Sequence, residues 1–230
     1  TRSFGLGGAY AGLSGDPSGL WFNPGGLVYA RRPNIQIATS LVGFEDYRLD
    51  NSSAERHSAI DELDETDFRL NPALTGGVIG LGERRADKTY NHAFSFLIVS
   101  PNWRFVRQRR GLDLTGTRAQ FDRELEDTSL WGGIGYAGRI TEDVALGFGL
   151  FYVARSVMRA DSFRLIDTST NPTSSFRHVD SELTVDTHHI TALVGAMFRV
   201  HPQVNLGVVV GAPGIPIASS AKFIAQESGS

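Results

Sequence analysis

The ten residues Ala145–Ala154 read ALGFGLFYVA, and large apolar side chains alternate with small ones through most of the stretch. Successive side chains of an extended chain point to opposite faces, so a period of two predicts a β-strand. The apolar face of this strand carries Leu146, Phe148, Leu150 and Tyr152. The opposite face carries Ala145, Gly147 and Gly149.

The same period recurs along the chain. His189–Val200 and Gln203–Val210 alternate clearly, and four further strands are predicted from weaker alternation: Asn34–Phe44, Thr75–Gly82, Tyr90–Ser100 and Thr128–Arg139. The uncharged window Val200–Ala221 is interrupted by three prolines, which argues against a transmembrane helix. The sequence therefore predicts an all-β chain with seven strands.

The predicted connections alternate between short and long. Short polar turns are expected at Glu83–Lys88, Ile140–Asp143 and His201–Pro202. Long polar segments are expected at Glu45–Asn71, Pro101–Asp127 and Asp161–Asp186, and the third can extend its flanking strands with Thr170–Thr173 as its tip. This asymmetry is typical of outer-membrane β-barrels, which have short periplasmic turns and long external loops.

Two predicted hairpins share an Arg–apolar–turn–Val–x–Leu–Gly frame, at Gly138–Gly147 and Phe198–Gly207. Their arginines, Arg139 and Arg199, are expected at the same membrane edge, at the height of the lipid headgroups. Five aromatic residues near predicted strand ends are compatible with interfacial girdles: Tyr90, Trp103, Trp131, Tyr136 and Tyr152.

Composition excludes several classes of function. The net charge of −3 gives no case for nucleic-acid binding. With no cysteine, the chain has no disulfide framework, no thiolate chemistry and no zinc–thiolate site. The run Gly5–Ala9 lacks the preceding strand and the Lys-Ser/Thr pair of a phosphate-binding loop, so close backbone packing is the better interpretation.

Three residues carry the best case for acid–base or metal chemistry: Asp186, His188 and His189. Asp186 and His188 are two apart and share a strand face, whereas His189 points the other way. Metal sites need three or four ligands, and no nucleophile motif accompanies these residues. We expect a polar lining near a loop base, with no metal, no cofactor and no enzymatic activity.

Two charged runs fall in predicted long loops. The basic run Arg104–Arg110 offers Arg104, Arg107, Arg109 and Arg110, which either contact lipopolysaccharide phosphates or belong to a solvated loop. The acidic run Asp61–Glu65 is expected to be a solvated loop, with cation binding as a remote option.

The first thirty residues are too broken by Gly and Pro for a long helix and too apolar for a disordered tail. The stretch GLGGAYAGLSGDPSGLWFNPGGL resembles the N-terminal signature of outer-membrane long-chain fatty-acid and hydrophobic-compound transporters (FadL/TodX type), including their PorV-like relatives. Gly25 departs from the usual alanine of this pattern. The matching positions are Gly7, Gly8, Ala9, Asp16, Ser18, Phe22, Asn23, Pro24, Gly26 and Leu27. The later stretch Val204–Ile217 resembles the family's mid-barrel strand.

The resemblance implies an antiparallel transmembrane β-barrel of fourteen strands in the outer membrane of a Gram-negative bacterium. Residues 1–32 correspond to an N-terminal hatch and residues 33–230 to barrel strands. Its gating residues would be Phe22, Asn23, Pro24, Gly25, Gly26 and Leu27. Seven strands leave an open edge, so the chain is expected to be about half of the barrel. An eight-stranded closed barrel, with Ala218–Ala225 as its last strand, is the alternative.

The implied function is passive uptake of hydrophobic compounds such as long-chain fatty acids. The expected partners are a hydrophobic small molecule or lipid and outer-membrane lipids, with no nucleic acid. A non-transporting scaffold that binds a protein partner through its long loops is the rival. A third reading is an outer-membrane enzyme that uses His188 and His189.

Overall fold

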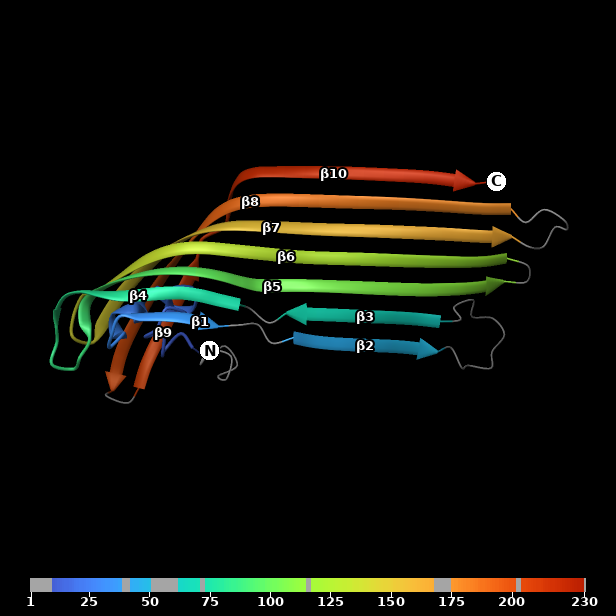
Figure 1. Ribbon diagram of the computed structural model, residues 1–230. Helices are drawn as coiled ribbons and strands as arrows, with labels where there is room; N and C mark the ends of the chain where they lie inside the picture. Colours follow the sequence, from blue (N-terminus) through green and yellow to red (C-terminus); the bar gives the residue numbers. More distant parts are fainter. Residues whose placement is uncertain are drawn as a thin grey trace.

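The computed structural model describes residues 10–38, 42–50, 62–70, 73–114, 117–167, 175–201 and 204–229. These residues form one antiparallel sheet of ten strands and two short helical turns (Figure 1). The helical turns are α2 (Gly19–Phe22) and η1 (Pro24–Tyr29). The strands are β1 (Asn34–Ala38), β2 (Val42–Asp50), β3 (Glu62–Leu70), β4 (Ala73–Arg84), β5 (Tyr90–Leu114), β6 (Thr117–Arg139), β7 (Val144–Asp167), β8 (Ser175–His201), β9 (Val204–Gly211) and β10 (Ile215–Gly229).

The ten strands make seven antiparallel passes. β3 and β4 lie end to end along β5, while β1 pairs with β4 and β2 pairs with β3 (Figure 1). At the other edge, β9 and β10 pair with successive parts of β8. The all-β antiparallel prediction is confirmed, and the number of passes equals the number of predicted strands. Among the described residues, no helix is both long enough and apolar enough to cross a membrane.

The predicted long loops are wrong over much of their length, because strands occupy them. Within Pro101–Asp127, residues 101–114 and 117–127 form the outer parts of β5 and β6, and β2 and β3 occupy much of Glu45–Asn71. Residues 62–65 of the acidic run lie on β3, and Asp61 lies outside the described residues. The third segment does extend its flanking strands, as expected, and its predicted tip, Thr170–Thr173, lies outside the described residues.

Charge pairing explains why these strands carry no apolar alternation. Arg107 is opposite Glu124, and Arg109 is opposite Asp122, with ion pairs of 3.3 and 2.9 Å. Opposite charges on directly facing residues stabilise antiparallel strands in place of apolar contacts. We call the part of the sheet beyond Trp103 of β5 and Thr128 of β6 the projecting sheet.

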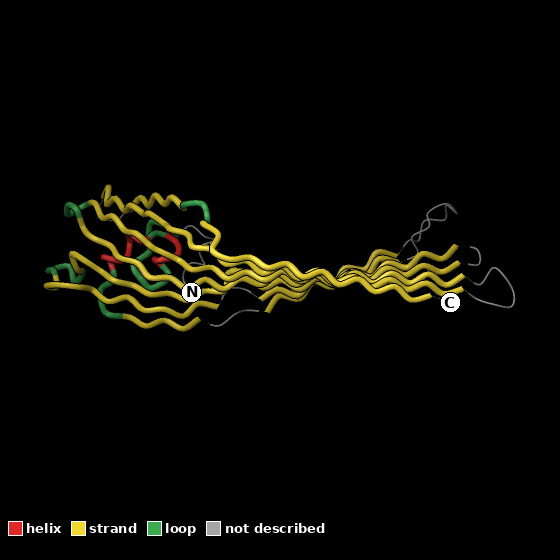
Figure 2. The backbone as a smooth tube through the Cα atoms, turned by 90° about the horizontal axis from the view of Figure 1, so that it is seen from above, coloured by secondary structure: helices red, strands yellow, loops and turns green. Residues whose placement is uncertain are grey.

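The other end of the sheet curves around residues Tyr10–Ala30, which we call the inner segment (Figure 2). Its side chains Leu20, Leu27 and Val28 are fully buried. They form one core with strand residues that include Leu97, Phe151 and Met197. The short connections lie at this end, as predicted, between Arg84 and Tyr90, between Arg139 and Val144, and between His201 and Val204.

The sheet is open along the strands that the structure describes. β1 pairs only with β4, and β10 pairs only with β8. Ala218–Ala225 does form a strand, as the eight-stranded alternative requires, but its one partner in the sheet is β8. That alternative is therefore not formed by the described residues.

Candidate functional site

The inner segment begins with a turn built around Asp16. The Asp16 carboxylate accepts hydrogen bonds from the Ser18 amide (2.9 Å), the Ser18 hydroxyl and the Tyr10 hydroxyl (2.6 Å). Asp and Ser side chains that bond nearby backbone groups favour turns and helix starts, which is why α2 begins at the next residue. The rings of Tyr10 and Phe22 lie edge to face, with centroids 5.5 Å apart. The segment is thus folded on itself before it meets the sheet.

Asn23 fastens the inner segment to the sheet. Its fully buried side chain donates from Nδ2 to the carbonyls of Ala11 (2.8 Å) and of Ala196 in β8 (3.0 Å). Its Oδ1 accepts from the Gly25 amide at 3.0 Å and so caps η1, whose first residue is Pro24. Asn at the N-cap and Pro at the first helical position are both strongly preferred. The Asn-Pro pair found in the sequence is therefore an anchor.

Glycines on three neighbouring strands let the backbone of the inner segment come this close. A Cβ on Gly195 would overlap the Asn23 side chain, one on Gly147 would overlap the Pro24 backbone, and one on Gly207 would overlap the Ala11 carbonyl. The small-residue face seen in Ala145–Ala154 is thus the face that receives the inner segment. A Cβ on Gly25 would lie 2.8 Å from the Gly195 carbonyl oxygen, so the alanine usual in the transporter pattern fits poorly here.

An aromatic cluster holds α2 against the same face. The Trp21 ring lies edge to face with Trp131 at 4.5 Å and with Phe151 at 5.8 Å between centroids. Trp131 also contacts His189, at 6.3 Å. The prediction of Trp131 in an interfacial girdle is wrong, because its position in β6 points it to the inner face. Three other predicted girdle residues are exposed on the outer face: Trp103, Tyr136 and Tyr152.

Tyr29, at the end of η1, lies between two arginines. The guanidinium carbons of Arg139 and Arg199 lie 4.7 and 5.2 Å from the centroid of its ring. These are the matched arginines of the two similar hairpins. Both lie at the end of the sheet that carries the short connections and occupy inward positions of β6 and β8, so they face the inner segment; their height in the membrane stays a prediction. The shared hairpin frame was a signal for this contact, which sequence reasoning did not connect to Tyr29.

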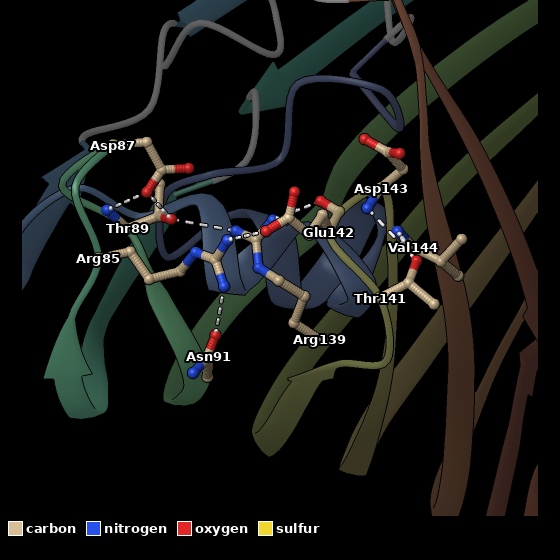
Figure 3. Close-up of polar contacts among 9 residues, drawn as sticks. All are labelled: Arg85, Asp87, Thr89, Asn91, Arg139, Thr141, Glu142, Asp143 and Val144. Atoms are coloured by element: carbon tan, nitrogen blue, oxygen red, sulfur yellow. Dashed lines mark hydrogen bonds and ion pairs between the residues drawn. The ribbon is translucent and has the colours of Figure 1, made fainter.

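Arg139 also ties two turns together (Figure 3). It donates from Nη1 to the Glu142 carbonyl (2.9 Å) and from Nη2 to the Thr89 hydroxyl (3.0 Å). Burial raises the pKa of the nearby Asp87 carboxyl, but hydrogen bonds from the Thr89 hydroxyl and amide, with Arg139 and Arg85, outweigh it and leave the pKa below its ordinary value. The turns thus hold Arg139 in place, and its guanidinium contacts the Tyr29 ring.

A polar cavity of 1270 Å³ adjoins the Tyr29 end of the inner segment. It lies toward the short connections and is lined by residues that include Tyr10, Asp16, Tyr29, Arg31, Asp87 and Arg199. The inner segment is therefore tightly packed on glycines at Asn23, and at Tyr29 it borders this polar cavity.

The outer face of the curved sheet carries a continuous set of exposed apolar side chains, which we call the apolar belt. It consists of Ile35, Ile37, Ile79, Leu81, Phe94, Phe96, Ile98, Ile134, Tyr136, Leu146, Phe148, Leu150, Tyr152, Val194, Phe198, Leu206 and Val208. Strand register aligns them in rows across the sheet: Phe94, Tyr136, Phe148 and Val194 are successive partners.

A Tyr–His pair lies near each border of the belt, and the Phe198–Leu206 row lies one row beyond the His92 pair. Tyr136 OH lies 2.8 Å from His92 Nδ1, and Tyr152 OH lies 2.8 Å from His188 Nδ1. The His92 row reaches β7 at Leu146, and the His188 row reaches it at Ala154. At about 3.3 Å per residue, these rows are roughly 26 Å apart along the strand.

The basic run does not form one patch. Arg104–Arg110 lies within β5, not in a loop, so its side chains alternate between two faces. Arg107 and Arg109 point outward and pair with Glu124 and Asp122. Arg104, on the opposite face with Arg110, pairs with buried Asp67 at 3.2 Å. Contact with lipopolysaccharide stays a prediction, and its loop setting is wrong.

The remaining candidates are placed as follows. Asp186 and His188 share the outer face and His189 faces inward, as predicted. Within the described ranges, no three His, Asp or Glu side chains come together as a metal site would require. Gly5–Ala9 lies outside the described residues.

No protein-family model matches this chain, and no curated protein matches it. Among solved structures, it is weakly similar to OmpT (in-vitro folded), an outer membrane protein of Vibrio cholerae in its trimer form. The identity is 8%, the match covers 86% of this chain and 99% of that chain, and the TM-score is 0.14. A TM-score this low carries no argument, so the fold rests on the strand pairing above.

Proposed function

We propose that this chain forms part of the wall of an outer-membrane β-barrel in a Gram-negative bacterium, and that the barrel takes up hydrophobic compounds such as long-chain fatty acids. The apolar belt is the observation that carries this proposal. Contiguous exposed apolar surface of this extent marks a membrane or partner interface. With strands tilted by about 40°, the 26 Å between the two Tyr–His rows corresponds to roughly 20 Å of height, and the Phe198–Leu206 row beyond them brings the belt to about 25 Å, the height of the apolar band of such barrels.

In this proposal the inner segment is a hatch inside the wall, and uptake is passive. Partitioning of the apolar ligand supplies the driving force, with no cofactor and no catalytic step, and His188 and His189 have no catalytic role. The part of the hatch around Asn23 stays fixed, because its release would break the three hydrogen bonds of the buried Asn23 side chain. The Tyr29 end opens, because its cation–π contacts adjoin a solvated cavity. This moves the gate from Asn23-Pro24 to Tyr29.

A double variant tests the hatch. Replacing Arg139 and Arg199 with Gln removes two contacts worth about 1 kcal/mol each, so the open population should rise about tenfold or more. We expect faster entry of a fluorescent fatty acid into vesicles that contain the full chain. Arg164→Gln, an exposed arginine of the projecting sheet, is the matched control. If the fatty acid enters at the wild-type rate in the double variant, Tyr29 does not form the gate.

A surface scaffold is the second candidate, and the projecting sheet favours it. From Trp103 to Leu114, β5 extends roughly 36 Å beyond the belt, with charged side chains on both faces. In the purified protein, an extractable apolar compound would favour uptake. A stoichiometric protein partner, lost when Arg107 and Arg109 are changed to Glu, would favour the scaffold.

A further inference from the structure

Two guanidinium groups contact the Tyr29 ring without a carboxylate to neutralise either of them. The ring centroid lies 4.7 Å from Arg139 Cζ and 5.2 Å from Arg199 Cζ. The side-chain hydrogen bonds of Arg139 go to uncharged acceptors, a backbone carbonyl and the Thr89 hydroxyl. Among the described residues, no carboxylate forms an ion pair with Arg139 or Arg199. Because like charges repel, two cations on one ring favour the binding of an anion between them.

The closed hatch also leaves buried polar atoms without partners at this place. The Tyr29 hydroxyl and Arg139 Nε are inaccessible to solvent, and neither has a hydrogen-bond partner in the described part of the chain. Buried polar atoms are nearly always hydrogen-bonded, because an unpaired one still bears the cost of losing water. Arg139 Nε is bonded to the guanidinium carbon that lies against the Tyr29 ring. The closed arrangement therefore lacks an acceptor for this N–H group.

The polar cavity of 1270 Å³ gives an anion a route to the two arginines. Tyr29 and Arg199 both line it, and Arg31 adds a further cation to its wall. The opening of the cavity toward the short connections places this route on the side of the hatch opposite the projecting sheet.

The carboxylates that line the same cavity do not fill the place of an anion between the two arginines. Asp16 accepts hydrogen bonds from Tyr10 and Ser18, and Asp87 accepts from Thr89, so both serve their own turns. The side chain of Asp143 points away from Arg139 (Figure 3). An anion from solution thus has no competing side chain of this kind at the Tyr29 ring.

We propose that a small oxyanion, a carboxylate or a phosphate, binds between Arg139 and Arg199 in place of the Tyr29 ring. Guanidinium groups bind oxyanions through parallel, charge-assisted hydrogen bonds, which replace the weaker cation–π contacts. The oxyanion supplies the acceptor that Arg139 Nε lacks, and the displaced Tyr29 hydroxyl gains water in the cavity. Anion binding therefore opens the hatch. This last step rests on the proposed function, whereas the binding itself does not.

Isothermal titration calorimetry of the full chain in detergent tests the site with inorganic phosphate, and chloride at equal ionic strength controls for screening. We expect Arg199→Gln to weaken phosphate binding about tenfold, and the double variant Arg139→Gln with Arg199→Gln to abolish it. Tyr29→Ala should strengthen phosphate binding about fivefold, because it removes the ring that competes for the arginines. Arg164→Gln, on the projecting sheet, is the matched control and should bind phosphate as the wild type does.

Two sources can supply the oxyanion: the carboxylate of a transported fatty acid, or a free anion on the cavity side of the hatch. A competition experiment with bound phosphate distinguishes them. If a long-chain fatty acid displaces phosphate and the fatty alcohol of the same length does not, the transported compound supplies the oxyanion. If neither compound displaces phosphate, the ligand is a free anion.

Three results would overturn the proposal. They are heat of phosphate binding no greater than that of chloride, phosphate binding that persists in the double variant, and weaker phosphate binding in Tyr29→Ala than in the wild type. Circular dichroism of each variant checks that the sheet is intact. The titration needs no membrane, so it is independent of uptake. A chain that binds phosphate but admits no fatty acid into vesicles keeps the anion site and contradicts the proposed function.

Discussion

Gly195 shows at the scale of one residue how the inner segment is seated. A Cβ at this position would overlap the Asn23 side chain. We expect Gly195→Ala to lower the free energy of unfolding by about 1–3 kcal/mol, as overpacking in a filled site does. Thermal unfolding in detergent measures the change. Gly132→Ala is the matched control, because a Cβ there meets nothing within 4 Å. Equal melting temperatures for the two variants would contradict the close approach.

The Asp87 carboxyl makes the turn between β4 and β5 sensitive to pH. Its pKa is lowered in the folded chain, so it contributes stability above its ordinary pKa and loses that contribution as pH falls through the lowered value. We expect the protection factor of the Thr89 amide, which donates to Asp87 at 3.0 Å, to fall below about pH 4. Hydrogen exchange measures this. In Asp87→Asn this pH dependence of the Thr89 amide should be absent. If it persists in that variant, another titrating group causes it.

The paired strands β5 and β6 hold the projecting sheet together through facing charges. Arg107→Glu alone places two carboxylates opposite each other and should destabilise this pair by about 0.5–1 kcal/mol. Adding Glu124→Arg restores opposite charges and should restore the stability. Hydrogen exchange along β5 measures both variants. If the double variant is as little protected from hydrogen exchange as the single variant, the ion pair is not what stabilises these strands.

The same two strands show what the sequence could predict at the scale of elements. Phe94 and Phe96 alternate with small residues, and that part of β5 was predicted as a strand. Beyond Trp103 both faces carry charges, so alternation ends although the strand continues. Only the register identifies the pairs, since Arg107 on β5 meets Glu124 on β6. The bulge between Val99 and Asn102 also changes which face each side chain occupies.

The candidate site was predictable where its contacts are local. The Asp16 turn and the cap made by Asn23 before Pro24 each join residues only two apart in the sequence, and the sequence analysis identified both positions as significant. The arginines on Tyr29 come from hairpins more than a hundred residues away, so their role needed the fold. The 440 Å³ hollow that Trp103 and His188 line on the outer face depends on four strands in register and has no linear motif.

Over the whole molecule, one sheet has two kinds of surface. Figure 2 shows the curved end, which surrounds the inner segment, and the projecting end. The outer face of the curved end is apolar, and the projecting end has charges on both faces. In a bilayer, the free edges of β1 and β10 require strand partners, because unpaired backbone groups are costly in lipid. Curvature, belt and edges together favour a barrel wall over a soluble sandwich.

The most direct test of this account measures which residues of β7 face lipid. The chain has no cysteine, so single spin-labelled cysteines can replace Leu146, Phe148, Leu150, Ser156 and Ala160 in vesicle-embedded protein. We predict high oxygen and low nickel-chelate accessibility at the first three positions, and the reverse at Ser156 and Ala160, beyond the His188 border. High nickel-chelate accessibility at Leu146, Phe148 and Leu150 would contradict the membrane assignment of the belt.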